Sequence, residues 1–435
     1  MIPALLCLWL ASPARADEAK TAAPEAPSRF TLHYQATVID VGHARFASPY
    51  AGKNSLTAPA DNATSVTSTL FLGARLAPGT EVILNPEVSG GRGIGNTLGM
   101  AGVPNGETFR VGDLRPTIYT ARLYLRQVFG LGGGTQTLED GPNQAAGTAD
   151  ARRVTVVAGK FSLADFFDGN AYAHDPRGQF MNWALMDSAA WDYPADARGY
   201  TWGLMTEYRE PEWSVRGAAA AMPKQANQLD MDRRLGRAHG FVVEGEHRTR
   251  MGERMGAARL LLFLNEAHMG NYDAALSAPG APDVTAPRAY GRSKYGAAFS
   301  ADQELVEHLG GFARLSWSDG RNETFAFTEA DASEAVGVEW TPARWGRAGD
   351  RWGAAVIANE LSDPHRRYLA AGGLGFLLGD GALHYGPETI LETYYRFPLM
   401  AHLWVSPDAQ LAFNPGYNRA RGPVPIWAVR VHAEF

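Results

Sequence analysis

The chain has 435 residues, of which 45% are hydrophobic and 20% are charged, and 40 Lys+Arg against 46 Asp+Glu give a formal net charge of −6. The charges are dispersed, so neither a basic face for nucleic acid nor an acidic disordered tail is indicated. After residue 16 no apolar stretch approaches the roughly 20 residues that a membrane-spanning helix needs. These features exclude a nucleic-acid-binding protein and a helical membrane protein.

The amino terminus has the pattern of an export signal. Residues 2–11 form a short apolar run, and small residues then flank a cleavage point before Asp17. We predict a signal peptide over residues 1–16 and a flexible periplasmic segment over 17–29. A buried amino-terminal helix is the alternative, and it fits poorly because a polar, Pro-rich stretch follows at once. The sole cysteine is Cys7, so the exported chain would carry no thiol, which suits an oxidising compartment.

Apolar residues alternate with polar ones in many segments of about ten residues. In 311–317, Leu315 and Trp317 lie on one parity, and Arg314 and Ser316 lie on the other. The final segment repeats the pattern, with Trp427, Val429 and Val431 against Arg430 and His432. A period of two predicts strands with one apolar and one polar face, and helical periodicity is nowhere sustained.

Segment 118–128 follows the same alternation. Its apolar parity contains Tyr119, Ala121, Leu123 and Leu125, and its polar parity contains Thr120, Arg122, Tyr124 and Arg126. We therefore expect the first four side chains to face outward and the second four to face the interior.

Marking such segments gives sixteen candidate strands, near 30–40, 66–77, 80–90, 117–130, 152–161, 200–209, 212–222, 239–249, 256–266, 293–304, 309–318, 332–341, 351–360, 387–398, 401–413 and 425–435. Long and short connections alternate, with 131–151 as the exception. An even number of antiparallel strands with loops at one end and turns at the other is typical of outer-membrane barrels.

The fold class predicted from this pattern is all-β. We expect a transmembrane antiparallel β-barrel over residues 30–435 with short periplasmic turns and long extracellular loops, most simply of 16 strands, with 18 as the alternative. Ten residues at about 3.3 Å each, tilted by about 40°, rise roughly 25 Å, which matches the apolar band of such barrels. A soluble secreted sandwich or β-helix remains as a competing interpretation, although it does not explain one apolar face along the whole chain.

Phe435 ends the last alternating strand. This arrangement is typical of barrels that the outer-membrane assembly machinery inserts, so that machinery and the outer-membrane lipid are expected partners. Aromatic residues also fall near predicted strand ends, as interfacial girdles require.

Three groups of motifs resemble the carbohydrate-selective porins of the OprB type. The first contains Gly159-Lys160-Phe161-Ser162, Asp165-Phe166-Phe167-Asp168, Asp175-Pro176-Arg177 and Gln179-Phe180-Met181-Asn182-Trp183. The second contains Leu374-Gly375-Phe376-Leu377-Leu378-Gly379-Asp380-Gly381, Pro387-Glu388 and Ile390-Leu391-Glu392. The third contains Asn414-Pro415-Gly416-Tyr417-Asn418, Arg421-Gly422-Pro423 and His432-Ala433-Glu434-Phe435.

The order and spacing of these motifs are more specific than any one of them. The likeness covers most of the chain from about residue 30 and implies a sixteen-stranded barrel that lets small sugars cross the outer membrane of a Gram-negative bacterium. Porins as a class further imply a homotrimer. Loops 223–238 and 267–292 match nothing recognisable, and their role is open.

The polar parity of the strands is expected to face the lumen, where guanidinium and carboxylate groups offer sugar hydroxyls donors and acceptors. Together with three loop residues, the candidate pore-lining set is Arg75, Glu87, Arg122, Tyr124, Arg126, Asp168, Asp175, Arg177, Arg314, Glu392, Arg396 and Arg430. The alternative for each residue is that lumen charges pair with one another and stiffen the wall.

The third long loop, 162–199, is the longest and is dense in aromatic and charged residues. Exposed aromatic clusters seek burial, so we expect it to fold into the barrel and narrow the channel, with Asp168, Asp175 and Arg177 near the narrowest point. A cap on the outer rim or a trimer contact is the alternative.

Enzymatic motifs are sparse, so we expect no catalysis, cofactor or metal. The Gly-rich runs lack dinucleotide spacing. Glu244 and His247 sit at a metal-like spacing, but on a strand they would point to opposite faces. Asp165 and Asp168 could in principle cleave glycosides, although loop charge is the simpler explanation. A passive sugar porin is thus the first hypothesis; a general porin without sugar preference and an outer-membrane enzyme acting on glycan or lipid are the alternatives.

Overall fold

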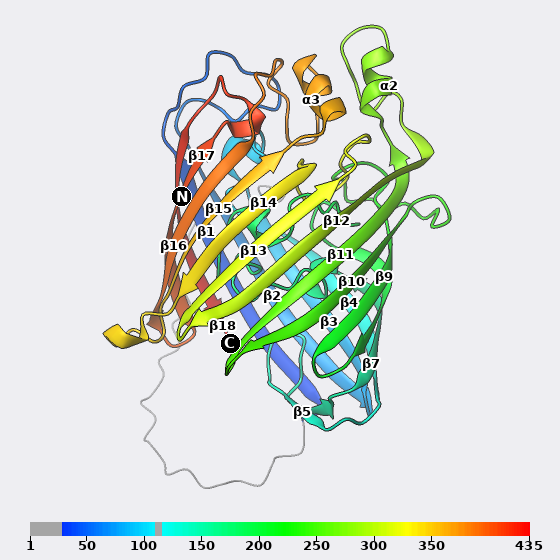
Figure 1. Ribbon diagram of the computed structural model, residues 1–435, viewed down its shortest axis with the longest axis vertical. Helices are drawn as coiled ribbons and strands as arrows, with labels where there is room; N and C mark the ends of the chain where they lie inside the picture. The colour runs from blue at the N-terminus through cyan, green and yellow to red at the C-terminus, as the bar shows by residue number, and fades with distance from the viewer. Residues whose placement is uncertain (1–27, 109–114) are drawn as a thin grey trace.

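The computed structural model describes residues 28–108 and 115–435 (Figure 1). The predicted signal peptide, and residues 17–27 of the predicted flexible segment, lie outside the described residues.

Sixteen of the strands in this described part of the chain close into one antiparallel barrel, as predicted. They are β1 Phe30–His43, β2 Asp61–Ala77, β3 Thr80–Gly91, β4 Thr117–Gly130, β7 Arg153–Phe161, β8 Thr201–Arg209, β9 Trp213–Ala221, β10 His239–Met251, β11 Arg254–Met269, β12 Ala289–Val306, β13 Leu309–Ser318, β14 Ala332–Trp340, β15 Arg351–Glu360, β16 Glu388–Met400, β17 Leu403–Phe413 and β18 Val424–Glu434. Each pairs with its neighbours in this order. All sixteen candidate segments correspond to barrel strands.

The remaining strands, β5 Thr135–Leu138 and β6 Gly147–Asp150, form a separate hairpin in the connection between β4 and β7. This is the connection that breaks the alternation of long and short links in the sequence. The barrel is therefore sixteen-stranded, and the alternative of eighteen is wrong because the two extra strands pair only with each other.

Short helices lie in the connections. They are α1 Trp183–Met186, α2 Tyr272–Ser277 and α3 Asp363–Ala370, with single 3-10 turns η1 Ile94–Asn96, η2 Leu163–Asp165, η3 Ala343–Trp345 and η4 Pro415–Tyr417. Figure 1 shows α2 and α3 above the barrel at the end that carries the long loops. Among the residues described, no helix is long and apolar enough to cross a membrane.

The first and last strands close the barrel. Gln35 of β1 pairs with Glu434 of β18, and the register continues to His43 and Ile426. Beyond the ladder, Tyr34 and Phe435 exchange backbone hydrogen bonds of 3.0 and 2.9 Å. Closure leaves no open sheet edge, which is what a lipid environment requires.

The two faces of the wall follow the predicted parity in most strands. Leu315 and Trp317 are each 51% exposed on the outside, whereas Arg314 is 2% exposed on the inside. The same holds for β18, where Trp427 is outward and Arg430 is inward and fully buried. The large apolar side chains on the surface thus form the outer, lipid-facing side.

Strand β4 departs from the expected alternation. The register between β3 and β4 shifts between Asn85 and Pro86, so that Arg122 pairs with Asn85 but Thr120 pairs with Pro86. This bulge leaves Ala121 as an extra residue without a partner on β3. The residues that precede Ala121 in β4 therefore face the opposite way from the one that the alternation predicts. Tyr119 and Ala121 therefore face the interior and Thr120 faces outward, which corrects the prediction that Tyr119 and Ala121 belong to the apolar outer face and Thr120 to the interior.

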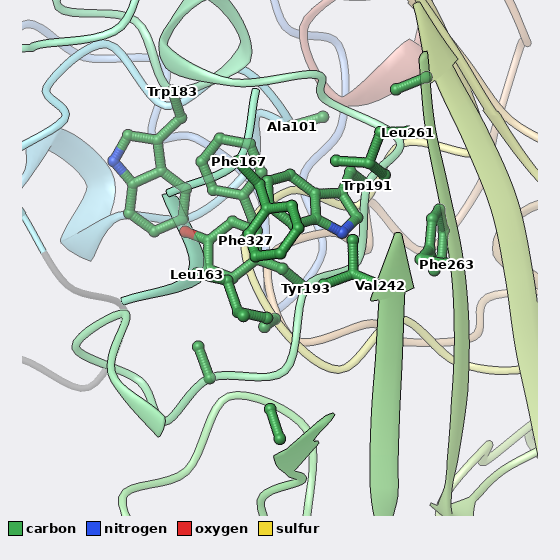
Figure 2. Close-up of a cluster of buried hydrophobic side chains, with 14 of the residues drawn as sticks. Ala101, Leu163, Phe167, Trp183, Trp191, Tyr193, Val242, Leu261, Phe263 and Phe327 are labelled. Atoms are coloured by element: carbon green, nitrogen blue, oxygen red, sulfur yellow. The ribbon is translucent and has the colours of Figure 1, made fainter. Parts of the chain in front are cut away.

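The long loops fill much of the interior at their end of the barrel. Figure 2 shows Phe167, Trp191, Tyr193 and Phe327 packed beside Val242, Leu261 and Phe263 of the wall. Trp191 lies 5.1 Å from Tyr193 between ring centres, and Tyr193 lies 5.1 Å from Phe327. These aromatic rings give the barrel a hydrophobic core made by loops.

The outer face provides a direct test of membrane insertion. Leu262 lies midway along β11 and is 53% exposed. Replacing Leu262 with Arg is expected to lower the free energy of unfolding from lipid vesicles by about 2–4 kcal/mol, since a charge at the bilayer midplane is costly. Ala278→Arg, on the exposed residue after α2, is the matched control and should change it by less than about 0.5 kcal/mol. Equal losses in the two variants would contradict the assignment of the lipid face.

Candidate functional site

Loop 162–199 lies inside the barrel and begins with η2. Asp168 is the first of its attachment points. The Asp168 backbone N–H donates to Glu244 of β10 at 2.7 Å, and its carboxylate accepts from Arg314 of β13 at 3.3 Å and from the backbone N–H of Ser188 at 2.5 Å. Arg314 also donates to the Leu185 carbonyl at 2.7 Å. The start and the middle of the loop are thus tied to one side of the wall.

The opposite side of the wall holds the next part of the loop. Arg430 of β18 donates to the carbonyls of Pro176 at 2.5 Å and Gln179 at 2.7 Å. Glu392 of β16 accepts from the backbone N–H groups of Met181 at 2.5 Å and Asn182 at 3.1 Å. The loop therefore crosses from β10 and β13 to β16 and β18.

Asp192 fixes the last part of the loop. Its carboxylate accepts from the backbone N–H groups of Phe325 at 3.0 and 3.1 Å and of Ala326 at 2.7 Å, and Lys294 Nζ of β12 lies 4.0 Å away. Burial raises the pKa of Asp192 from its ordinary value near 3.8 to about 6, although Lys294 and these N–H groups act in the opposite direction.

Four of the predicted pore-lining residues serve as these anchors. Arg314, Glu392 and Arg430 point inward from the wall but are at most 2% exposed, because loop 162–199 covers them, and Asp168 of the loop is 1% exposed against Arg314. This corrects the expectation that they line the open path. Parity alone gives the direction of a side chain and does not show whether a loop lies over it.

Four others meet at a cavity of about 340 Å³ between the loop and the wall formed by β2, β3 and β4. Its lining includes Glu87, Arg122, Asp175 and Arg177. Ligand sites commonly have volumes of about 300–1,000 Å³, so this space is large enough to be considered a binding site.

Glu87 of β3 is at the centre of the polar wall of this cavity. It is 1% exposed and accepts hydrogen bonds from Thr69 at 2.5 Å, Tyr200 at 3.3 Å and Tyr119. Arg177 Nη2 lies 3.4 Å from the same carboxylate. A buried carboxylate with this many donors is fixed in position.

Two ion pairs continue the wall. Arg122 binds Asp165 through two hydrogen bonds of 2.7 and 2.5 Å, and Arg177 Nε donates to Glu107 at 3.1 Å. Arg122 Nη1 has no hydrogen-bond partner within the described ranges. Arg177 bonds there through Nε and Nη2, so its Nη1 is likewise unused. Among the described residues, the cavity lining holds more carboxylates than arginines: Glu87, Glu107, Asp165, Asp175, Asp187 and Asp196 against Arg122, Arg177 and Arg198.

Aromatic rings lie beside the cations. The Arg198 guanidinium is 4.0 Å from the centre of the Tyr119 ring, and Arg122 is 5.3 Å from that of Tyr200. Trp183, which also lines the cavity, stacks on Phe327 with ring centres 6.0 Å apart. Cation–π contacts at these distances attract the guanidinium groups to the rings.

The other predicted residues lie elsewhere. Arg75 and Arg126 both pair with Glu81 toward the short-turn end. Tyr124 is buried against Phe161 and Phe166, and Arg396 lies over the ring of Trp404 at 4.4 Å on the opposite wall. The structure thus brings four of the twelve together at one cavity and distributes the rest.

Sequence reasoning missed Glu107, Thr67, Tyr119 and Tyr200 as parts of this site. The alternation predicts an outward Tyr119 because it does not reveal the bulge. Pro86 inside a predicted strand was the available signal, since proline within a sheet marks an edge or a bulge. Glu107 lies in a loop, where periodicity carries no information, and Tyr200, at the start of the predicted strand 200–209, immediately precedes β8.

Two weaker chemical hypotheses are also resolved by geometry. Glu244 is buried inside and His247 is exposed outside, so they face opposite ways, as predicted. Asp165 and Asp168 are each held by a different arginine, and Asp168 is 1% exposed. Neither pair presents two free groups to a substrate.

Comparison with known proteins gives the family. The profile of the carbohydrate-selective porin OprB family matches residues 54–435. The chain belongs to the OprB family. A search among curated proteins found no match.

Solved structures show the same fold as this OprB-family porin. The high-pH structure of Pseudomonas putida OprB aligns with a TM-score of 0.71 and 16% identity, covering 93% of this chain and 94% of that one. The outer membrane channel DcaP of Acinetobacter baumannii aligns with a TM-score of 0.51 and 9% identity, covering 93% and 97%. A. baumannii OccAB1 gives 0.50 and 10%, covering 93% and 96%.

The anchor Arg314 can be tested by substitution. Arg314→Met leaves the Asp168 carboxylate buried without its cation, so we expect a loss of about 3–5 kcal/mol in the free energy of unfolding by urea. Arg314→Met combined with Asp168→Asn should recover part of that loss, because the unpaired charge is gone. An unfolding free energy unchanged in the single variant would show that the pair does not hold the loop.

Asp192 predicts a pH dependence. The pKa of Asp192 is about 6 in the folded protein and near 3.8 ordinarily. As pH falls, the folded state therefore binds the proton before the unfolded state does. The contribution of Asp192 to the free energy of unfolding accordingly decreases as pH rises from about 4 to about 6. Asp192→Asn lacks this titration. The free energy of unfolding of the wild type minus that of Asp192→Asn should therefore decrease as pH rises across that range, by at most about 3 kcal/mol. A difference that is constant with pH would contradict the assignment.

Proposed function

We propose that this porin gives passive, carbohydrate-selective diffusion to small sugars, mono- or disaccharides, across the outer membrane of a Gram-negative bacterium. The observation that carries the proposal is the cavity lined by Glu87, Arg122 and Arg177. Its carboxylates Glu87, Glu107 and Asp165 are already paired with arginines, and Arg177, which donates through Nε and Nη2, has Nη1 left as a donor. Membership in a family of carbohydrate-selective porins supports it.

The pairing of the arginines suits a neutral solute better than an anion. A site with unpaired arginines would retain anions, whereas here Arg122 and Arg177 are each matched by carboxylates. Sugar hydroxyls can accept from Nη1 of Arg177 and donate to carboxylate oxygens. The aromatic faces of Trp183 and Tyr200 offer apolar surface for a pyranose ring.

Loop 162–199 would set the constriction. It crosses the barrel between its anchors on β10, β13, β16 and β18, and it contributes Asp175 and Arg177 to the cavity. A solute passing the cavity would exchange water for a few hydrogen bonds. Such binding must stay weak enough for the solute to leave, and the pre-existing ion pairs limit it, because they occupy most of the donors and acceptors.

Arg177 tests the proposal. In planar bilayers, ion current through the wild-type protein is expected to fall saturably as glucose or a disaccharide is added. Arg177→Gln removes a charged donor from the cavity, so the sugar concentration that halves the current should rise about tenfold, since a hydrogen bond to a charged group contributes about 1.5 kcal/mol or more.

Arg344→Gln is the matched control, because Arg344 is 84% exposed and pairs weakly with Glu307 at 4.0 Å at the short-turn end. It should leave the half-blocking concentration unchanged. Wild-type channels whose current ignores sugars would indicate a general porin without sugar preference. A wild-type response that Arg177→Gln does not alter would place the sugar site elsewhere.

A further inference from the structure

The connection between β4 and β7 stands out at the short-turn end of the barrel. It runs from residue 131 to 152 and contains the hairpin β5–β6, whereas most connections at that end are tight turns of two or three residues. Figure 1 shows β5 at the end of the barrel opposite α2 and α3.

The part between the two short strands contacts the inner wall over several strands. Asp140 pairs with His33 of β1 at 3.3 Å, and the Ala146 carbonyl accepts from Arg75 of β2 at 2.6 Å. Asn143 accepts from the Asn85 side chain of β3 at 2.8 Å. These three partners are inward-facing residues of three neighbouring strands. Segment 139–146, called the tip here, therefore lies inside the barrel.

The depth of the tip follows from Asn85. This residue is five positions along β3 from Thr80 at the turn, or about 16 Å at 3.3 Å per residue, and two positions from Glu87, or about 7 Å. Asn85 is fully buried. The tip thus reaches from the short-turn end to just below the cavity that contains Glu87.

The tip is an ordered turn. Gly141 and Gln144 exchange two backbone hydrogen bonds of 3.0 Å, and the Gln144 side chain donates to the Glu139 carbonyl at 2.8 Å. At its base, Arg153 donates to Gln136 at 2.9 Å. These contacts give the segment a fixed shape of its own in addition to its attachment to the wall.

We infer that the tip forms a second narrow section of the passage, on the exit side of the sugar cavity. This inference rests on the proposed function of the cavity. A solute that leaves Glu87 and Arg122 toward the short turns meets the tip next. The surface there is polar, and Arg75 and Arg126 share the single carboxylate of Glu81, so this group of three carries one excess positive charge. The tip therefore limits conductance by occupying cross-section, while affinity for sugar is set above it.

Deleting residues 135–149 tests this directly. The deletion keeps Gly132 and Asp150, whose hydrogen bond of 2.7 Å closes the base of the connection. Because a wider pore conducts more, single-channel conductance in KCl should rise by about twofold or more, while the half-blocking glucose concentration changes by less than about twofold. Unchanged conductance in a heat-modifiable, folded barrel would overturn the inference.

A cysteine variant keeps the test decisive if the deletion does not fold. The sole cysteine is Cys7, within the predicted signal peptide, so an introduced thiol is unique in the exported chain. Modifying Asn143→Cys with a charged methanethiosulfonate reagent should reduce the current by about half or more, because added bulk would block a narrow section. Glu212→Cys, on the exposed turn between β8 and β9, is the matched control and should show no change.

The outcomes separate the two proposals. Current that is unaffected at Asn143→Cys, with labelling verified by mass, would place the tip outside the passage. If the tip variants change the conductance but sugar does not affect the wild-type current, the inference about the tip is supported and the proposed sugar site is rejected. Absence of channels in folded wild-type protein would reject both.

Discussion

The structure depends on one constraint: backbone polar groups in the hydrocarbon core of a membrane find no partner except one another. The chain meets it by pairing β1 with β18, so that the wall has no edge. Closure with sixteen strands then creates an interior too wide for the wall's own side chains to fill. The loops complete the interior, and the aromatic residues that a soluble protein would put in its core lie here in loop 162–199 and its neighbours.

Filling a barrel with a loop brings charges into a buried place. Arg314, Glu392 and Arg430 are inward-facing and nearly inaccessible, and each finds hydrogen-bond partners in the loop. Burying a charge without such partners costs several kcal/mol. Inward-facing Arg and Glu residues therefore have two roles. They bind loop 162–199 where the loop covers them, and they line the cavity where the loop leaves space.

Much of the fold could be predicted from the sequence because a barrel strand records its two environments residue by residue. The pattern of 311–317 shows this, and all sixteen strands were located in this way. The packing of Arg430 against loop 162–199 could not be predicted, because its partners Pro176 and Gln179 lie some 250 residues earlier in the chain. Tyr119 was misplaced for a local reason, the bulge opposite Pro86. The aromatic content of 162–199 did indicate burial, whereas the inward course of 131–152 left no periodic signal.

The anchors of loop 162–199 bind mostly main-chain atoms. Arg430 contacts the carbonyls of Pro176 and Gln179, and Glu392 contacts the N–H groups of Met181 and Asn182. Main-chain groups are the same whatever side chain a residue carries. A residue of the loop that faces the cavity, such as Asp175, can thus be exchanged without removing these main-chain contacts, whereas Arg177 also binds Glu87 and Glu107 through its side chain. One barrel of this design can accept a series of different linings, so its selectivity can diverge while its scaffold stays constant.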